Sequence, residues 1–264
     1  MNNSITDDVG GDDGKREKID ELIEDAIMVA DSEIDFNSFD VIFVVHARGS
    51  MQTIAQWSGS AAAEPYITTC ASYYSGTTND GLVSLPVSIV SEFESRGTYA
   101  HEFGHCLDLP DLYDYNDLLR IGICQNFVGQ WDLMGVGAHN SLMFGLFGAS
   151  PAHLSSFCKI GLGWIEPSQI KYVYPGETIV VTIEPLELPN SGIYTVKIPI
   201  DQNRYYLVET RQRILCDKCL ADSGIMIYLC DESIPSGYGP VRVRDAEEKA
   251  SGSGSGMRVE TLRR

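Results

Sequence analysis

The first regular pattern along the chain is an apolar stripe at helical spacing. Apolar residues recur every three or four positions from Ile19 to Ala30, and acidic residues occupy most of the positions between them. This periodicity predicts an amphipathic helix over about 15–31. The β-branched run Val41 to His46 predicts a buried strand. The stretch 49–79, rich in Ser, Thr, Gly and Ala, predicts a loop with room for one strand.

Proline residues limit the next elements. Leu82 to Ser91 has the composition of a strand, and Pro86 within it predicts an edge position because proline cannot donate to a ladder. A helix is expected over 96–108, and Pro110 prevents it from continuing far. A further helix is expected over 150–159, with Ser as its cap and Pro in its first turn.

The pattern changes after Pro167, where short β-like runs alternate with Gly, Pro, Asn and Asp. The predicted fold class is therefore α+β, with a mixed first part and a β-rich second part. The expected strands are 178–183, 193–198, 205–210 and 225–229. The expected segments are a disordered acidic N-terminus over 1–14, a first domain over 15–167, a β-rich region over 168–248 and a flexible tail over 249–264.

Composition and charge restrict the function. The chain has 264 residues with 19 Lys+Arg against 37 Asp+Glu, a formal charge of −18. This acidity argues against nucleic acid as a partner, because phosphate binding needs a basic face. No apolar run approaches the roughly 18 residues that a membrane span needs. Residues 1–14 are polar and acidic, so no secretion signal is present there.

Seven cysteines do not suggest a disulfide scaffold, because their number is odd and they are spread along a long chain. Cys216 and Cys219 have the spacing of half a zinc ribbon, but no second pair follows. A structural role, in a disulfide or as plain thiols, is the preferred interpretation.

The segment His101 to Asp111 carries the most informative motif. On a helix, His101 and His105 are four residues apart and present both imidazoles on one face. Two such imidazoles can hold one Zn²⁺, and Glu102 stands beside them as a general base for a water. The alternative is two surface histidines with an ordinary helical Glu.

A catalytic zinc usually takes three protein ligands, so one more is needed. Asp111 is the preferred third ligand, and Asp114 is the alternative. To bring Asp111 back, the helix has to end in a sharp turn near position 108. Asp108 is one of the few residues other than Gly that tolerate a left-handed turn.

A second feature lies downstream, in the sequence Trp131-Asp132-Leu133-Met134-Gly135. In metzincin peptidases a Met-containing turn passes beneath the zinc site, which makes Met134 the candidate Met-turn residue. Taken alone, Met134 would be interpreted as core.

Other polar residues have plainer interpretations. His46 is expected to be a hydrogen-bonded core residue, His139 a loop residue, and His153 a packing residue. Trp164 is expected in the core. A calcium site at Asp114, Asn116 and Asp117 is weighed against a solvated acidic loop, which is preferred.

Taken together, these blocks resemble the immune inhibitor A-like zinc metallopeptidases, a secreted metzincin-type family. The resemblance extends over about 19–245 and rests on FVVHA at 43–47, AHEFGHCLDLPDLYD at 100–114, WDLMG at 131–135, PAHLSSFCKIGLGWI at 151–165, YYLVETRQ at 205–212 and GIMIYLCDE at 224–232. It implies His101, His105 and Asp111 as ligands, Glu102 as general base and acid, and Met134 in the Met-turn.

The resemblance also implies an extracellular protein, made with a propeptide and often holding calcium besides zinc. The chain departs from the family in two ways. Asp108 stands where the family has Gly, and no signal, propeptide or early strands precede the first helix. We therefore expect an N-terminally truncated form.

The predicted function is a zinc-dependent endopeptidase acting on proteins or peptides, with an extended substrate lying along the strand edge at Val87–Val90. The alternative is a non-catalytic or inactive truncated homologue that binds peptide or metal. A zinc hydrolase of non-peptide substrates is disfavoured by the resemblance of the later blocks.

Overall fold

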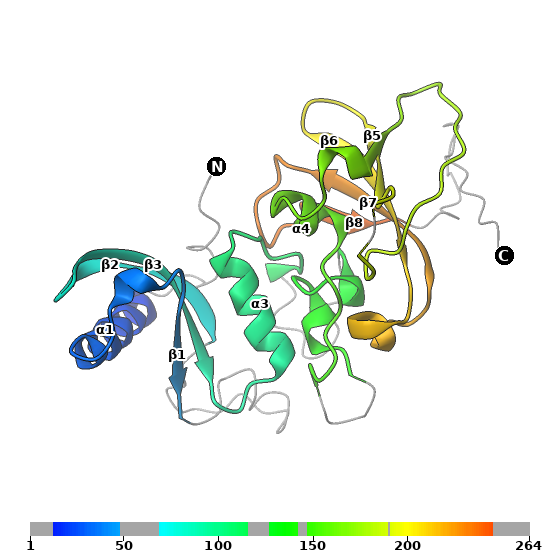
Figure 1. Ribbon diagram of the computed structural model, residues 1–264. Coiled ribbons are helices and arrows are strands. Elements are labelled where there is room, and N and C mark those ends of the chain that lie inside the picture. Colours follow the sequence, from blue (N-terminus) through cyan, green and yellow to red (C-terminus); the bar gives the residue numbers. More distant parts are fainter. Residues whose placement is uncertain (1–12, 48–68, 116–126, 142–146, 190, 245–264) are drawn as a thin grey trace. The chain divides into compact units, whose positions relative to one another are not determined.

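The computed structural model describes residues 13–47, 69–115, 127–141, 147–189 and 191–244 (Figure 1). The chain forms two compact units, residues 1–110 and 111–264. Helices and mixed sheets occur together, so the fold is α+β as expected. Within the described part, no helix has the length and apolar character needed to cross a membrane.

In the described part of the first unit, a three-stranded sheet and two α-helices are the main elements. The strands lie in the order β1-β3-β2, where β1 is Ile42–His46, β2 is Cys70–Thr78 and β3 is Gly81–Ser91. Strand β1 runs parallel to β3, and β2 runs antiparallel to it. Helix α1 (Asp13–Ala30) confirms the amphipathic helix, since its buried Ile19, Ile23 and Ile27 join the same core as Val87 and Ile89 of β3.

The prediction that 82–91 is an edge strand is wrong, because β3 is the central strand. Val87 pairs with Ile42 of β1 on one side and with Ser72 of β2 on the other. Pro86 is tolerated because β1 pairs with β3 only from Val87 onward. An extended substrate therefore cannot pair along 87–89 as expected, since β1 and β2 already occupy both edges there, and β1 also occupies one edge at Val90.

Strand β1 is less buried than its apolar sequence suggests. Its residues alternate between half-buried and exposed, and the side chains of Phe43 and Val45 are 37% and 52% exposed. The Phe43 ring contacts two rings of the neighbouring helix: its centroid lies 6.1 Å from that of Tyr99 and 6.2 Å from that of Phe103. Ile42 and Val44 pack against the core, whereas Phe43 and Val45 on the other face stay partly exposed even though Phe43 contacts two aromatic rings, contrary to the expected buried strand.

Helix α3 (Arg96–Cys106) confirms the expected helix. The Ser95 hydroxyl accepts a hydrogen bond from the Thr98 amide, which satisfies one of the unpaired donors of the first turn. The helix ends two residues earlier than expected.

A five-stranded sheet dominates the second unit, in the order β4-β5-β6-β7-β8. Strand β4 is parallel to β5 and the other neighbours are antiparallel. The five strands have these bounds: β4 is Ile170–Tyr172, β5 is Thr195–Pro199, β6 is Arg204–Arg211, β7 is Gly224–Asp231 and β8 is Val241–Val243.

Three of the four strands expected here are confirmed as β5, β6 and β7. The strand expected at 178–183 is wrong, because this segment has no regular structure and Val180 is 97% exposed. Its β-branched residues matched the composition of a strand, but no strand of the described residues pairs with it. Strands β4 and β8, of three residues each, were too short to give a sequence pattern.

The helix expected over 150–159 is partly wrong. Helix α4 spans Ser156–Gly161, and residues 151–155 are not helical. Buried carboxylates take the backbone donors of this segment: the His153 amide donates to Asp217 and the Ser155 amide to Asp132, both at 2.7 Å. The side chain of Trp164 is 57% exposed, so its predicted place in the core is also wrong.

A buried ion cluster lies beneath this segment. The fully buried Arg211 guanidinium pairs with Asp217 at 2.6 Å, Glu209 at 3.2 Å and Glu187 at 3.4 Å. The same guanidinium donates to the carbonyl oxygen of Trp131 at 2.6 Å. This cluster therefore ties β6 to the segment that precedes Met134.

Candidate metal centre

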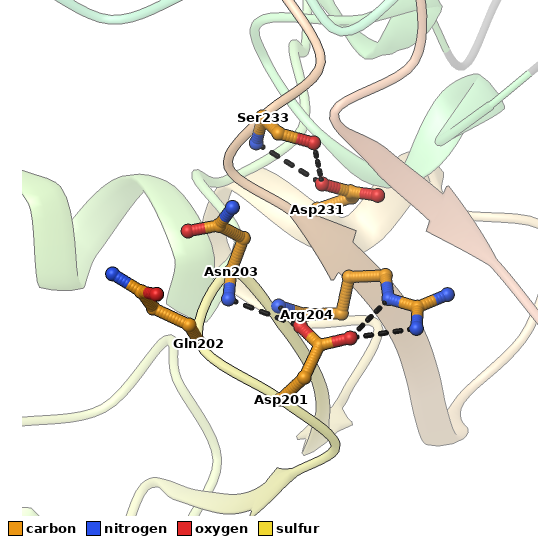
Figure 2. Close-up of a pocket in the computed structure, with 6 residues that line it drawn as sticks. All are labelled: Asp201, Gln202, Asn203, Arg204, Asp231 and Ser233. Atoms are coloured by element: carbon orange, nitrogen blue, oxygen red, sulfur yellow. Dashed lines mark hydrogen bonds and ion pairs between the residues drawn. The ribbon is translucent and has the colours of Figure 1, made fainter.

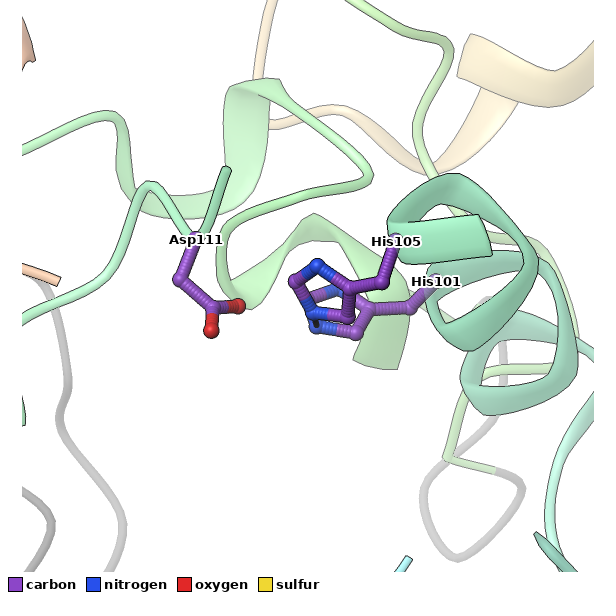
Figure 3. A group of neighbouring side chains, drawn as sticks. All are labelled: His101, His105 and Asp111. Carbon is purple, nitrogen blue, oxygen red and sulfur yellow. Dashed lines mark hydrogen bonds between the residues drawn. The ribbon is translucent and has the colours of Figure 1, made fainter. Parts of the chain in front are cut away.

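Helix α3 brings two imidazoles together. His101 and His105 are both buried, and their Nε2 atoms lie 3.1 Å apart (Figure 3). Two nitrogen ligands of a tetrahedral zinc, each at about 2.0–2.1 Å from the metal, lie about 3.3 Å apart. The spacing of the two rings therefore fits a shared divalent cation.

The tautomer of His105 is defined by its second ring nitrogen. Nδ1 lies 2.9 Å from the carbonyl oxygen of Leu109, and a carbonyl oxygen can only accept. Nδ1 therefore carries the proton and Nε2 presents its lone pair. This is the arrangement in which a histidine ligand is oriented by a main-chain carbonyl.

The helix ends in a turn that redirects the chain. Asp108 has a φ of 66°, in the left-handed region. The Leu109 amide donates to the Gly104 carbonyl at 3.0 Å and the Asp108 amide to the His105 carbonyl at 2.9 Å. These two bonds form a Schellman motif with Asp108 at the position that Gly usually occupies. Asp at this position thus adopts the geometry that a Gly would provide.

Beyond the turn, Asp111 joins the two histidines. It is fully buried, and one ligand atom from each of His101, His105 and Asp111 lies within 4.8 Å of the others (Figure 3). The three residues belong to one short stretch of chain, so the path of the backbone through the turn sets their proximity. Two imidazoles and one carboxylate are a donor set that suits zinc.

Glu102 lies on α3 beside His101 and is 3% exposed. Burial and then the Glu102 carboxylate raise the pKa of the Cys106 thiol to about 12. Cys106 is therefore a neutral thiol at physiological pH, and it does not belong to the group of three ligand atoms found among the described residues.

Met134 lies in a buried turn. It is fully buried, its amide donates to the Asp132 carboxylate at 2.7 Å, and its carbonyl oxygen accepts from the Leu112 amide at 2.8 Å. The turn is therefore bonded to the residue that follows Asp111.

The remaining candidates lie elsewhere. Asp114 is half-buried and is not part of the three-residue group found among the described residues. Asn116 and Asp117 lie outside the described residues, so the preferred solvated acidic loop and the alternative calcium site both stay untested predictions. His46 is half-buried at the end of β1 with Nδ1 3.0 Å from the Ala47 carbonyl, and His139 ends a short 3₁₀ helix. Burial and then Lys159 lower the pKa of His153 to about 4, in agreement with its predicted packing role.

Sequence reasoning missed the residues that hold Asp111. Its amide donates to the Ser236 hydroxyl at 2.8 Å, and the Tyr115 hydroxyl donates to its Oδ2 at 2.8 Å. Tyr115 directly follows the sequence block that contains the ligands and could have been considered. Ser236 lies 125 residues away and gave no signal.

A surface pocket of about 350 Å³ lies between the β5–β6 turn and the end of β7 (Figure 2). Its two carboxylates are already engaged, Asp201 with Arg204 and Asp231 with Ser233. These internal bonds explain the turns but leave little chemistry for a ligand.

The sequence profile of the immune inhibitor A peptidase M6 catalytic domain matches residues 8–165, more than half of the chain. A search of curated proteins found no match. The chain therefore belongs to the immune inhibitor A peptidase family, which is a family of metallopeptidases. The matched segment contains His101, His105, Asp111 and Met134, and ends before Ser236.

Proposed function

We propose that this protein is a zinc-dependent endopeptidase of the metzincin type, with His101, His105 and Asp111 as the metal ligands. The observation that carries the proposal is the approach of these three buried side chains within 4.8 Å in a chain of the peptidase M6 family. The protonated Nδ1 of His105 adds support, because it leaves Nε2 directed at the same point as His101.

When bound, zinc lowers the pKa of a water and polarises the peptide carbonyl. The proton transfers of the reaction are carried out by a residue of the chain. The Glu102 carboxylate accepts the proton as the water attacks the peptide carbonyl carbon, and it delivers this proton to the nitrogen of the leaving amine. Burial of Glu102 keeps bulk water from competing for this proton.

Secretion is proposed on the same basis, since the family is typically extracellular. The non-catalytic alternative differs in one outcome only: it binds zinc or peptide without turnover. An impaired turn at Asp108 was one of the grounds for this alternative, and the left-handed φ of 66° there supports the enzyme on that point.

The test is to purify the chain, count zinc by elemental analysis and assay hydrolysis of a fluorescent casein. We expect about one zinc per chain. Asp111→Ala should lose the metal, whereas Glu102→Gln should keep it and lose about 10²–10⁴-fold in rate. Zinc without hydrolysis in the wild type would select the non-catalytic homologue, and a folded chain without zinc would overturn the proposal.

A further inference from the structure

Asp111 is held by a part of the chain that lies far beyond the matched catalytic domain. Its amide donates to the Ser236 hydroxyl at 2.8 Å, and its carbonyl oxygen accepts from the Gly237 amide at 3.1 Å. The turn at 236–237 thus bonds both sides of the Asp111 main chain.

Tyr115 links this turn to the carboxylate. Its amide donates to the Gly237 carbonyl at 3.1 Å, and its hydroxyl donates to Asp111 Oδ2 at 2.8 Å. The ring lies against Gly237, where a Cβ would be 2.3 Å from a ring carbon, and Gly237 has a φ of 73°. Only glycine therefore allows the ring to lie this close to the turn.

The three side chains and the Asp111 amide form a closed ring of hydrogen bonds. The Tyr115 hydroxyl lies 3.4 Å from the Ser236 hydroxyl, and either could be the donor. A carboxylate oxygen accepts only, so the Tyr115 proton points to Asp111 and the Ser236 proton must point to Tyr115. The ring then runs from the Asp111 amide to Ser236, from Ser236 to Tyr115, and from Tyr115 back to the Asp111 carboxylate.

We infer that Tyr115 and the Ser236–Gly237 turn are positioning residues for the third metal ligand, and this inference rests on the proposed zinc site. A hydrogen bond to one carboxylate oxygen fixes the rotation of the carboxylate, and bonds to the main chain fix its position. Partners of this kind typically change metal affinity by about 10–100-fold.

The first test compares Tyr115→Phe with Tyr238→Phe. The Tyr238 ring packs on Tyr115 at 5.9 Å but is 50% exposed, so its variant is a matched control. Zinc affinity is measured by competition with a chelator, and the ligand field is read from the visible absorption of the cobalt-substituted protein. We expect Tyr115→Phe to weaken zinc binding about 10–100-fold and to shift the cobalt bands. Tyr238→Phe should leave both unchanged.

A second pair of variants serves if Tyr115→Phe does not fold, as judged by circular dichroism. Ser236→Ala removes the acceptor of the Asp111 amide and should weaken zinc binding, whereas Ser236→Thr keeps a hydroxyl and should restore it. Wild-type affinity and an unchanged cobalt spectrum in Tyr115→Phe, or in Ser236→Ala, would overturn the positioning role while leaving the zinc site intact. A folded wild type that binds no zinc would instead overturn the proposed function.

Discussion

The main-chain amide of Leu112 donates a 2.8 Å hydrogen bond to the main-chain carbonyl oxygen of Met134. The chain leaving Asp111 is therefore bonded to the buried turn through backbone atoms, and the Met134 side chain contributes packing. Met134→Leu nearly conserves volume and should cost less than about 1.5 kcal/mol of unfolding free energy.

Met134→Ala should cost about 2–5 kcal/mol because it leaves a cavity. Urea denaturation measures both variants, and elemental analysis should find zinc retained in Met134→Leu. Loss of zinc from Met134→Leu, at unchanged stability, would mean that the side chain itself supports the site.

Asp108 offers a test of the left-handed turn. Asp108→Gly removes the steric cost of a positive φ but gives the unfolded chain more freedom, and each effect is about 1 kcal/mol. We therefore expect its unfolding free energy to stay within about 1 kcal/mol of the wild type, with zinc retained. Asp108→Val places a β-branched residue at this φ and should lower stability by about 1–2 kcal/mol. Equal thermal unfolding of the Gly and Val variants would contradict the turn.

The Arg211 cluster predicts a large effect on stability. Arg211→Met leaves Asp217 and Glu209 buried without their cation, which should cost about 3–5 kcal/mol. Arg204→Met is the matched control, because Arg204 pairs with Asp201 at 2.6 Å on the exposed surface and should change stability little. Chemical denaturation measures the unfolding free energy of both variants. Similar decreases in the two would rule out a special role for the buried cluster.

Glu187 gives the cluster a pH dependence. Burial and then a hydrogen bond with Asp217 raise the pKa of Glu187 to about 7 from an ordinary value of 4.5. The unfolded chain therefore loses this proton first as the pH rises, so the folded state becomes less stable between about pH 4.5 and 7.

Glu187→Gln cannot lose a proton and avoids this penalty. Relative to the wild type, it should gain stability as the pH rises from 5 to 8, with most of the gain complete near pH 7. Unfolding midpoints of the two proteins at matched pH values measure the difference, and a difference independent of pH would refute the expectation.

The sequence was most informative where a local pattern decides the structure. The stripe from Ile19 to Ile27 and the spacing of His101 and His105 depend on one helix each, and both helices are present. The predictions were wrong where residues distant in the sequence determine the local structure. Pro86 indicated an edge, but β1 joins only beyond it. The His153 and Ser155 amides donate to carboxylates at 217 and 132 rather than within a helix.

The candidate site likewise has one part that local spacing predicts and another part that distant contacts supply. The ligands and Asp108 lie within one contiguous motif, so spacing was enough to propose them. Ser236 could not be deduced, because a hydrogen bond between residues 111 and 236 has no counterpart in local periodicity. Tyr115 lies close to the ligands in sequence, but no pattern indicated its hydrogen bond to the Asp111 carboxylate.

The bond between Asp111 and Ser236 also sets an order of events during synthesis. It closes a loop of 125 residues, so it cannot form until residue 236 has left the ribosome. A nascent chain that ends earlier contains the two-histidine segment and Asp111 but lacks the hydroxyl that accepts from the Asp111 amide. The third ligand of the proposed metal site therefore gains this anchor only after residue 236 emerges, which places the completed hydrogen-bond ring late in synthesis.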